Sequence, residues 1–120
     1  MALVLVVEDE LSIARLVEDV LTDEGHRVVI AGNGRRALEI AAEEKPAIVL
    51  TDFMMPVMDG GAFVRAMAED HALKDVPVIV MSSMPEEAVA ERCEGYVAFV
   101  RKPFKIMDII QLVTEHLPPD

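Results

Sequence analysis

Four polar residues of types used in phosphoryl transfer each lie within two residues after an apolar run: Asp9, Asp52, Ser82 and Lys102. Two carboxylates brought together repel, and a cation relieves that repulsion. Mg2+ accepts oxygen ligands and usually completes its shell with water and substrate phosphate. A lysine adds a compact positive charge, and a hydroxyl donates to a phosphoryl oxygen. Such a set supports phosphoryl transfer, with Asp52 as the natural nucleophile.

Each of these residues taken alone has a simpler interpretation. An acidic residue at a strand end often caps a helix, and a serine there does the same. A single lysine is usually a surface residue. The hypothesis of a site therefore depends on all four side chains meeting at one place, and that depends on the fold.

Five apolar runs indicate strands. They show little polar alternation, which is typical of strands covered on both faces of a parallel sheet. Four of them end in polar groups, and ligands bind outside the carboxyl ends of such strands. The runs are residues 3–7, 28–31, 47–51, 78–81 and 96–100, and the polar ends are Glu8-Asp9-Glu10, Asp52, Ser82-Ser83 and Arg101-Lys102-Pro103.

Amphipathic segments with helical spacing separate the runs. Five strands and five helices in strict alternation predict a doubly wound α/β domain with right-handed crossovers. We expect one domain over residues 1–120, since this length suits a single core. The predicted helices contain residues 13–21, 37–41, 63–67, 85–92 and 106–117.

Composition narrows the classes of function. A hydrophobic share of 52% supports a packed core, and the formal net charge of -11 opposes binding to nucleic acid or anionic membranes. No apolar run approaches the length of a membrane span, and we expect a cytoplasmic protein. The single cysteine, Cys93, excludes an internal disulfide and is interpreted as a packing or surface residue.

In this order and spacing, four segments resemble the response regulator receiver domain of two-component signalling, over essentially the whole chain. The resemblance implies a flavodoxin-like (βα)5 fold with a five-stranded parallel sheet of order 2-1-3-4-5. It also implies a cis bond between Lys102 and Pro103. The segments are residues 6–10, 50–60, 77–83 and 99–104.

The resemblance also implies a role for each site residue. Asp52 would accept the phosphoryl group from the phosphohistidine of a histidine kinase or phosphotransfer protein. Mg2+ would be held by Asp9, Asp52 and the backbone carbonyl of Met54, with Glu8 acting through water. Lys102 would contact the acyl phosphate.

A switch is implied as well. Ser82 would turn toward the phosphoryl group and Phe99 would follow it inward, although Phe99 also suits plain core packing. This would reshape the face formed by the fourth helix, fifth strand and fifth helix for a downstream partner or effector domain that the sequence does not identify. Met54 and Met84 offer no side-chain hydrogen bond to an attacking water, which favours slow self-dephosphorylation; both also suit a role as neutral gap-fillers.

Two other classes of function remain open. A haloacid-dehalogenase-like phosphohydrolase uses a similar set, but it needs a second Asp two residues after the nucleophile, where this chain has Met54. A binding module that kept the fold and lost phosphorylation is the third hypothesis. The receiver hypothesis predicts a chain that turns over no separate substrate and catalyses only its own phosphorylation and slow dephosphorylation.

Overall fold

The computed structural model describes residues 2–118, so Pro119 and Asp120 of the proline-rich tail lie outside the described residues. Strands and helices alternate along the chain. The strands are β1 (Leu3–Val7), β2 (Arg27–Ala31), β3 (Ile48–Asp52), β4 (Val78–Ser82) and β5 (Ala98–Arg101). The helices are α1 (Leu11–Asp23), α2 (Gly34–Glu43), α3 (Gly60–Glu69), α4 (Glu86–Ala90) and α5 (Ile106–His116).

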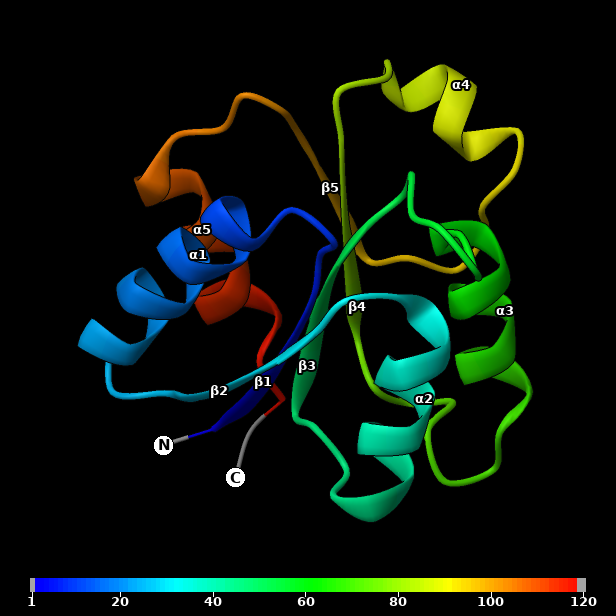
Figure 1. The fold of residues 1–120 in the computed structure, drawn as a ribbon, viewed down its shortest axis with the longest axis horizontal. Coiled ribbons are helices and arrows are strands. Elements are labelled where there is room, and N and C mark those ends of the chain that lie inside the picture. Colours follow the sequence, from blue (N-terminus) through cyan, green and yellow to red (C-terminus); the bar gives the residue numbers. More distant parts are fainter. Residues whose placement is uncertain (1, 119–120) are drawn as a thin grey trace.

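The strands form one parallel sheet in the order β2-β1-β3-β4-β5 (Figure 1). The predicted fold class and strand order are therefore confirmed. The order reverses direction at β1, so β3 lies beside β1 although α1, β2 and α2 separate them in the chain. Ligands of doubly wound sheets bind at this kind of switch point.

Helices cover both faces of the sheet, with α1 and α5 on one side and α2, α3 and α4 on the other (Figure 1). Two apolar clusters fill the spaces between the layers. Every residue of β3 and β4 is buried, which explains why these runs show no alternation of polar residues. The two central strands thus form a rigid base for the residues at their carboxyl ends.

Some boundaries differ from the sequence prediction. Helix α4 is shorter than predicted, at five residues, because Pro85 stands as its N-cap and the helix ends at Ala90. Strand β5 begins at Ala98 and not at residue 96, since its pairing with β4 starts opposite Ile79. Gly95, three residues before the strand, has a φ of 90°, a backbone conformation that favours glycine.

The start of α3 fits tightly behind the end of β3. The Asp59 side chain accepts a hydrogen bond from the Ala62 N–H at 2.8 Å and caps the helix. The Gly60 N–H donates to the Phe53 carbonyl at 2.7 Å. A Cβ on Gly60 would lie 2.7 Å from the Phe53 Cα and 2.9 Å from the Asp52 carbonyl oxygen. Only glycine permits this approach of helix to strand.

Cys93 is buried in the apolar cluster between the sheet and the α2–α3 side. Burial raises the pKa of its thiol to about 11. The thiol is therefore protonated at neutral pH, which agrees with the interpretation of Cys93 as a packing residue. Within residues 2–118 no helix has the length and apolar character needed to cross a membrane.

Gly60→Ala is expected to destabilise the protein by about 1–3 kcal/mol, because backbone atoms of β3 must move to admit the new methyl group. Denaturant unfolding would measure the loss. Gly32→Ala is the matched control, since a Cβ there meets nothing within 4 Å. Equal stability of the two variants would contradict the close packing of α3 on β3.

Candidate functional site

The four predicted strand ends meet at the carboxyl edge of the sheet. Asp52 is the last residue of β3 and Ser82 the last residue of β4. Asp9 follows β1, and Lys102 follows β5. The Lys102 N–H donates to the Ser82 carbonyl at 2.8 Å, and the Lys102–Pro103 bond is cis, as expected. The fold therefore brings together residues that are up to 94 positions apart in the chain.

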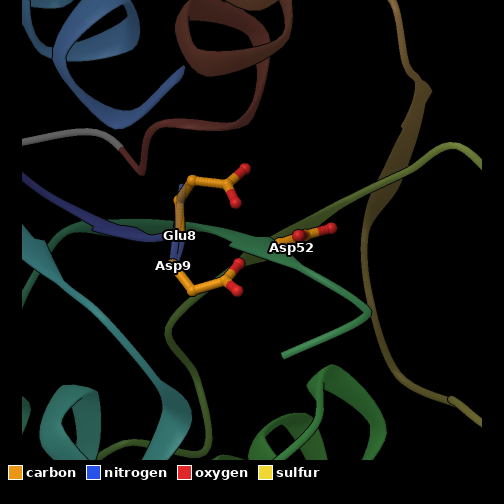
Figure 2. Close-up of side chains that lie close together, drawn as sticks. All are labelled: Glu8, Asp9 and Asp52. Carbon is orange, nitrogen blue, oxygen red and sulfur yellow. The ribbon is translucent and has the colours of Figure 1, made fainter. Parts of the chain in front are cut away.

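Three carboxylates crowd the centre of this edge. Glu8, Asp9 and Asp52 each place one oxygen within 4.8 Å of the others (Figure 2). Glu8 and Asp52 are buried, and Asp9 is exposed. Two charges at 4.8 Å repel by roughly 3 kcal/mol at an effective dielectric constant of about 20. Oxygen donors in this arrangement, open to solvent on one side, suit a hard divalent cation such as Mg2+.

The Lys102 ammonium lies between the two buried carboxylates. Its Nζ is 2.6 Å from Glu8 Oε1 and 3.3 Å from Asp52 Oδ2. The shorter contact is a hydrogen bond from Lys102 to Glu8. One cation thus offsets part of the negative charge of three carboxylates.

Burial raises the pKa of Glu8 to about 7, and the negative charge of Asp52 adds to this shift, while Lys102 opposes it. Burial alone would lower the pKa of Lys102, but Glu8 and Asp52 outweigh that effect and raise it. The lysine is therefore held in its charged form. The raised pKa of Glu8 shows that its charge is unfavourable in this buried position, which again favours an added cation.

Ser82 is fully buried at the end of β4. Its Oγ accepts a hydrogen bond from the Met84 N–H at 3.0 Å. The hydroxyl proton is not used in that bond, so Ser82 can still donate to another oxygen. A donor at this strand end is what a phosphoryl group on the neighbouring β3 would require.

Phe99 is half-buried on β5 and packs against the apolar cluster that contains α2, α3 and α4 residues. The Tyr96 ring lies beside it, with 6.4 Å between the centroids and 50° between the planes. The Tyr96 hydroxyl donates to Glu86 Oε2 at 3.0 Å. This contact connects the aromatic pair on the β5 side to the first residue of α4.

Met54 lies in the loop after β3, and its side chain is 58% exposed. Met84 follows β4 and is half-buried. Met54 therefore follows Asp52 closely in the chain and Met84 follows Ser82, and neither side chain donates a hydrogen bond. Their effect on the rate of dephosphorylation stays a prediction.

Sequence analysis missed two features of the site. The first is the ion pair between Glu8 and Lys102, whose partners it assigned separately to metal and to phosphate. The second is the bridge from Tyr96 to Glu86. The only available signals were the longer reach of Glu compared with Asp at residue 8 and the position of Tyr96 three residues before Phe99.

Residues 4–114 match the family model of the response regulator receiver domain. The rice two-component response regulator ORR11 is 32% identical over 96% of this chain and 80% of its own length. The probable transcriptional regulator ycf27 of Porphyra purpurea is 38% identical, but the match covers 84% of this chain and 41% of the relative. The chain thus spans less than half the length of that longer relative.

Solved structures give the same result. Vibrio cholerae chemotaxis response regulator CheY4 superposes with a TM-score of 0.90 at 31% identity, over 98% of this chain and 99% of that one. The receiver domain of sensor histidine kinase PA1611 from Pseudomonas aeruginosa PAO1 has a TM-score of 0.89 at 25% identity, over 96% of both chains. That structure has a magnesium ion coordinated in the active site cleft.

Asp9→Asn is expected to weaken Mg2+ binding by about tenfold or more, because it removes one of three converging carboxylates. Isothermal titration calorimetry with MgCl2 would measure the change. Asp19→Asn is the matched control, since Asp19 is exposed farther along α1. An equal loss of Mg2+ affinity in both variants would mean that overall surface charge causes the loss, and it would contradict a metal site at Asp9.

Proposed function

We propose that this chain, which belongs to the response regulator receiver family, accepts a phosphoryl group on Asp52 from the phosphohistidine of a histidine kinase or phosphotransfer protein. The observation that carries the proposal is the position of Asp52. Its buried carboxylate lies beside two other carboxylates and 3.3 Å from the Lys102 ammonium. A carboxylate in such a site can be both nucleophile and phosphoryl carrier.

The transfer exchanges one phosphorus bond for another. A carboxylate oxygen of Asp52 attacks the phosphorus atom, and an O–P bond forms while the P–N bond to the donor imidazole breaks. The imidazole nitrogen keeps the electron pair of the broken bond. The product is an aspartyl phosphate on Asp52 and a free histidine on the donor.

Asp9, Asp52 and the backbone carbonyl of Met54 would hold Mg2+, with Glu8 acting through water. Bound there, Mg2+ supplies positive charge to the phosphoryl oxygens. The carboxylates of Glu8, Asp9 and Asp52, within 4.8 Å of one another, support this assignment. Lys102, whose ammonium lies 3.3 Å from Asp52 Oδ2, would stabilise the negative charge of the acyl phosphate.

Ser82 would turn toward the phosphoryl group and donate its hydroxyl proton to a phosphoryl oxygen, since its bond with the Met84 N–H does not use that proton. Phe99 would then move toward the space beside β4. Because Phe99 packs with Tyr96, and Tyr96 bonds to Glu86, this movement would reach α4. The signal would leave through the face of α4, β5 and α5, where a downstream partner or an effector domain would bind.

Apolar side chains around the site favour a protein as the phosphoryl donor. Leu11, Met54, Val57 and Met107 are all more than half exposed. They belong to the start of α1, the β3–α3 loop and the first turn of α5, which are the segments that follow the site strands. Exposed apolar groups of this kind mark surfaces that bind other proteins. We propose that residues 1–120 act as one receiver unit in this exchange.

Asp52→Asn is expected to abolish phosphorylation, because an amide oxygen does not replace the carboxylate nucleophile. The protein would be incubated with acetyl phosphate and MgCl2, and the gain of about 80 Da per phosphoryl group would be followed by mass spectrometry. Asp19→Asn is the control, and circular dichroism would check that both variants fold.

Three results would contradict the proposal. A full mass gain on Asp52→Asn would place the acceptor elsewhere. No mass gain on the wild-type chain would favour a binding module that has kept the fold alone. Release of inorganic phosphate from a phosphate ester would instead favour a hydrolase.

The phosphorylated chain is expected to lose its phosphoryl group slowly, over minutes or longer, because Met54 and Met84 offer no hydrogen bond to orient an attacking water. Met54→Asn should shorten the lifetime several-fold by adding an amide at the rim. Met54→Leu, which keeps the apolar character, should leave it unchanged. Loss of labelled phosphate from the wild-type protein within seconds would show that this reasoning is wrong.

A further inference from the structure

We propose that Glu8 is a positioning residue that anchors the Lys102 ammonium in the unphosphorylated protein, and that Asp52 is only the secondary partner of this lysine. The role goes beyond metal binding by Glu8. Its effect on phosphoryl transfer rests on the proposed function, whereas the anchoring itself is a property of the chain before phosphorylation.

The distances rank the two partners of Lys102. Its Nζ lies 2.6 Å from Glu8 Oε1, which is at the short end for a charge-assisted hydrogen bond. The separation from Asp52 Oδ2 is 3.3 Å, which is longer than such a bond. The ammonium is therefore held by Glu8 and only attracted by Asp52.

Burial strengthens the contact with Glu8. The Glu8 side chain is 1% exposed and that of Lys102 is 16% exposed, so water screens this pair weakly. Removing one member of a buried pair leaves the other charge without a partner, which is unfavourable. The buried charge of Glu8 therefore stabilises the position in which Lys102 contacts it.

The second oxygen of Glu8 also has a protein partner. The Glu10 N–H donates to Glu8 Oε2 at 3.3 Å. With Lys102 on one oxygen and a backbone N–H on the other, the Glu8 carboxylate is fixed in orientation without a metal ion. Asp9 and Asp52 remain the carboxylates that are free to take a cation directly.

Anchoring keeps Lys102 next to Asp52 without neutralising the nucleophile through a short hydrogen bond. The ammonium has three donors, so it can reach a phosphoryl oxygen on Asp52 from its place beside Glu8. Phosphoryl oxygens and Glu8 then compete for the same charge. The length of the Glu8 side chain matters here, because Asp at this position is one methylene shorter.

Nuclear magnetic resonance of the lysine ammonium groups in metal-free protein tests the anchoring. The chain has four lysines, and Lys45, Lys74 and Lys105 are exposed internal controls. With 15N-labelled lysine, the Lys102 ammonium signal should persist at a temperature where the other three are lost to exchange with water. Its loss in Lys102→Met assigns the signal.

Glu8→Gln should raise the hydrogen-exchange rate of the Lys102 ammonium at least fivefold, whereas Asp52→Asn should raise it less than twofold. Glu8→Asp should behave like Glu8→Gln, because the charge remains but the reach is lost. Backbone amide spectra of each variant check the fold. A large effect of Asp52→Asn with little effect of either Glu8 variant would overturn the proposal.

Beryllofluoride with MgCl2 separates this proposal from the proposed function. In the wild-type chain it should shift the Lys102 signal as the ammonium turns toward the phosphoryl analogue. If beryllofluoride fails to bind while Glu8→Gln still accelerates exchange, the anchoring stands and the acceptor role of Asp52 fails. If beryllofluoride binds but Glu8→Gln leaves the exchange rate unchanged, the anchoring fails and the acceptor role of Asp52 stands.

Discussion

Repulsion among three carboxylates at one edge of the sheet is the constraint on which the site depends. One carboxylate oxygen from each of Glu8, Asp9 and Asp52 lies within 4.8 Å of the other two. The Lys102 ammonium contacts two of these side chains, Glu8 and Asp52. A cluster of this kind persists only if the surrounding structure holds it, because free side chains would separate. The same repulsion that makes the cluster costly gives it affinity for a cation. Repulsion among the carboxylates therefore explains both why the cluster is unfavourable by itself and why it attracts a cation.

The rigidity comes from the parallel sheet and its tight contacts. Strands β3 and β4 are wholly buried, so Asp52 and Ser82 stand at the ends of elements that cannot shift without disturbing both apolar clusters. Gly60 lets α3 begin directly against the backbone of Asp52 and Phe53. Asp52, the proposed nucleophile, is thus placed by backbone packing, and this would suit a site in which positioning supplies most of the catalysis.

The fold and the location of the site could be predicted from sequence because both depend on periodicity and on polar residues at strand ends. Asp52, Ser82 and Lys102 were placed correctly at one edge, since parallel strands all end on the same side. The hydrogen bond from Lys102 to Glu8 could not be predicted, because it depends on the reach of two side chains 94 positions apart. The length of α4 also escaped prediction, since its five residues carry too little pattern.

Two sets of contacts link β5 to its neighbours, one at the site and one farther back along the strand. The Lys102 N–H bonds to the Ser82 carbonyl, so the backbone of the lysine and that of the serine move together. Three residues before Lys102, Phe99 packs with Tyr96, whose hydroxyl bonds to Glu86 at the start of α4. Helix α4 has few residues and one buried side chain, Val89, so little packing opposes its displacement. Under the proposed function, a change of charge at Asp52 would act between a rigid sheet on the β1 and β3 side and a weakly held helix beyond β4, so we expect the response to be directed toward α4.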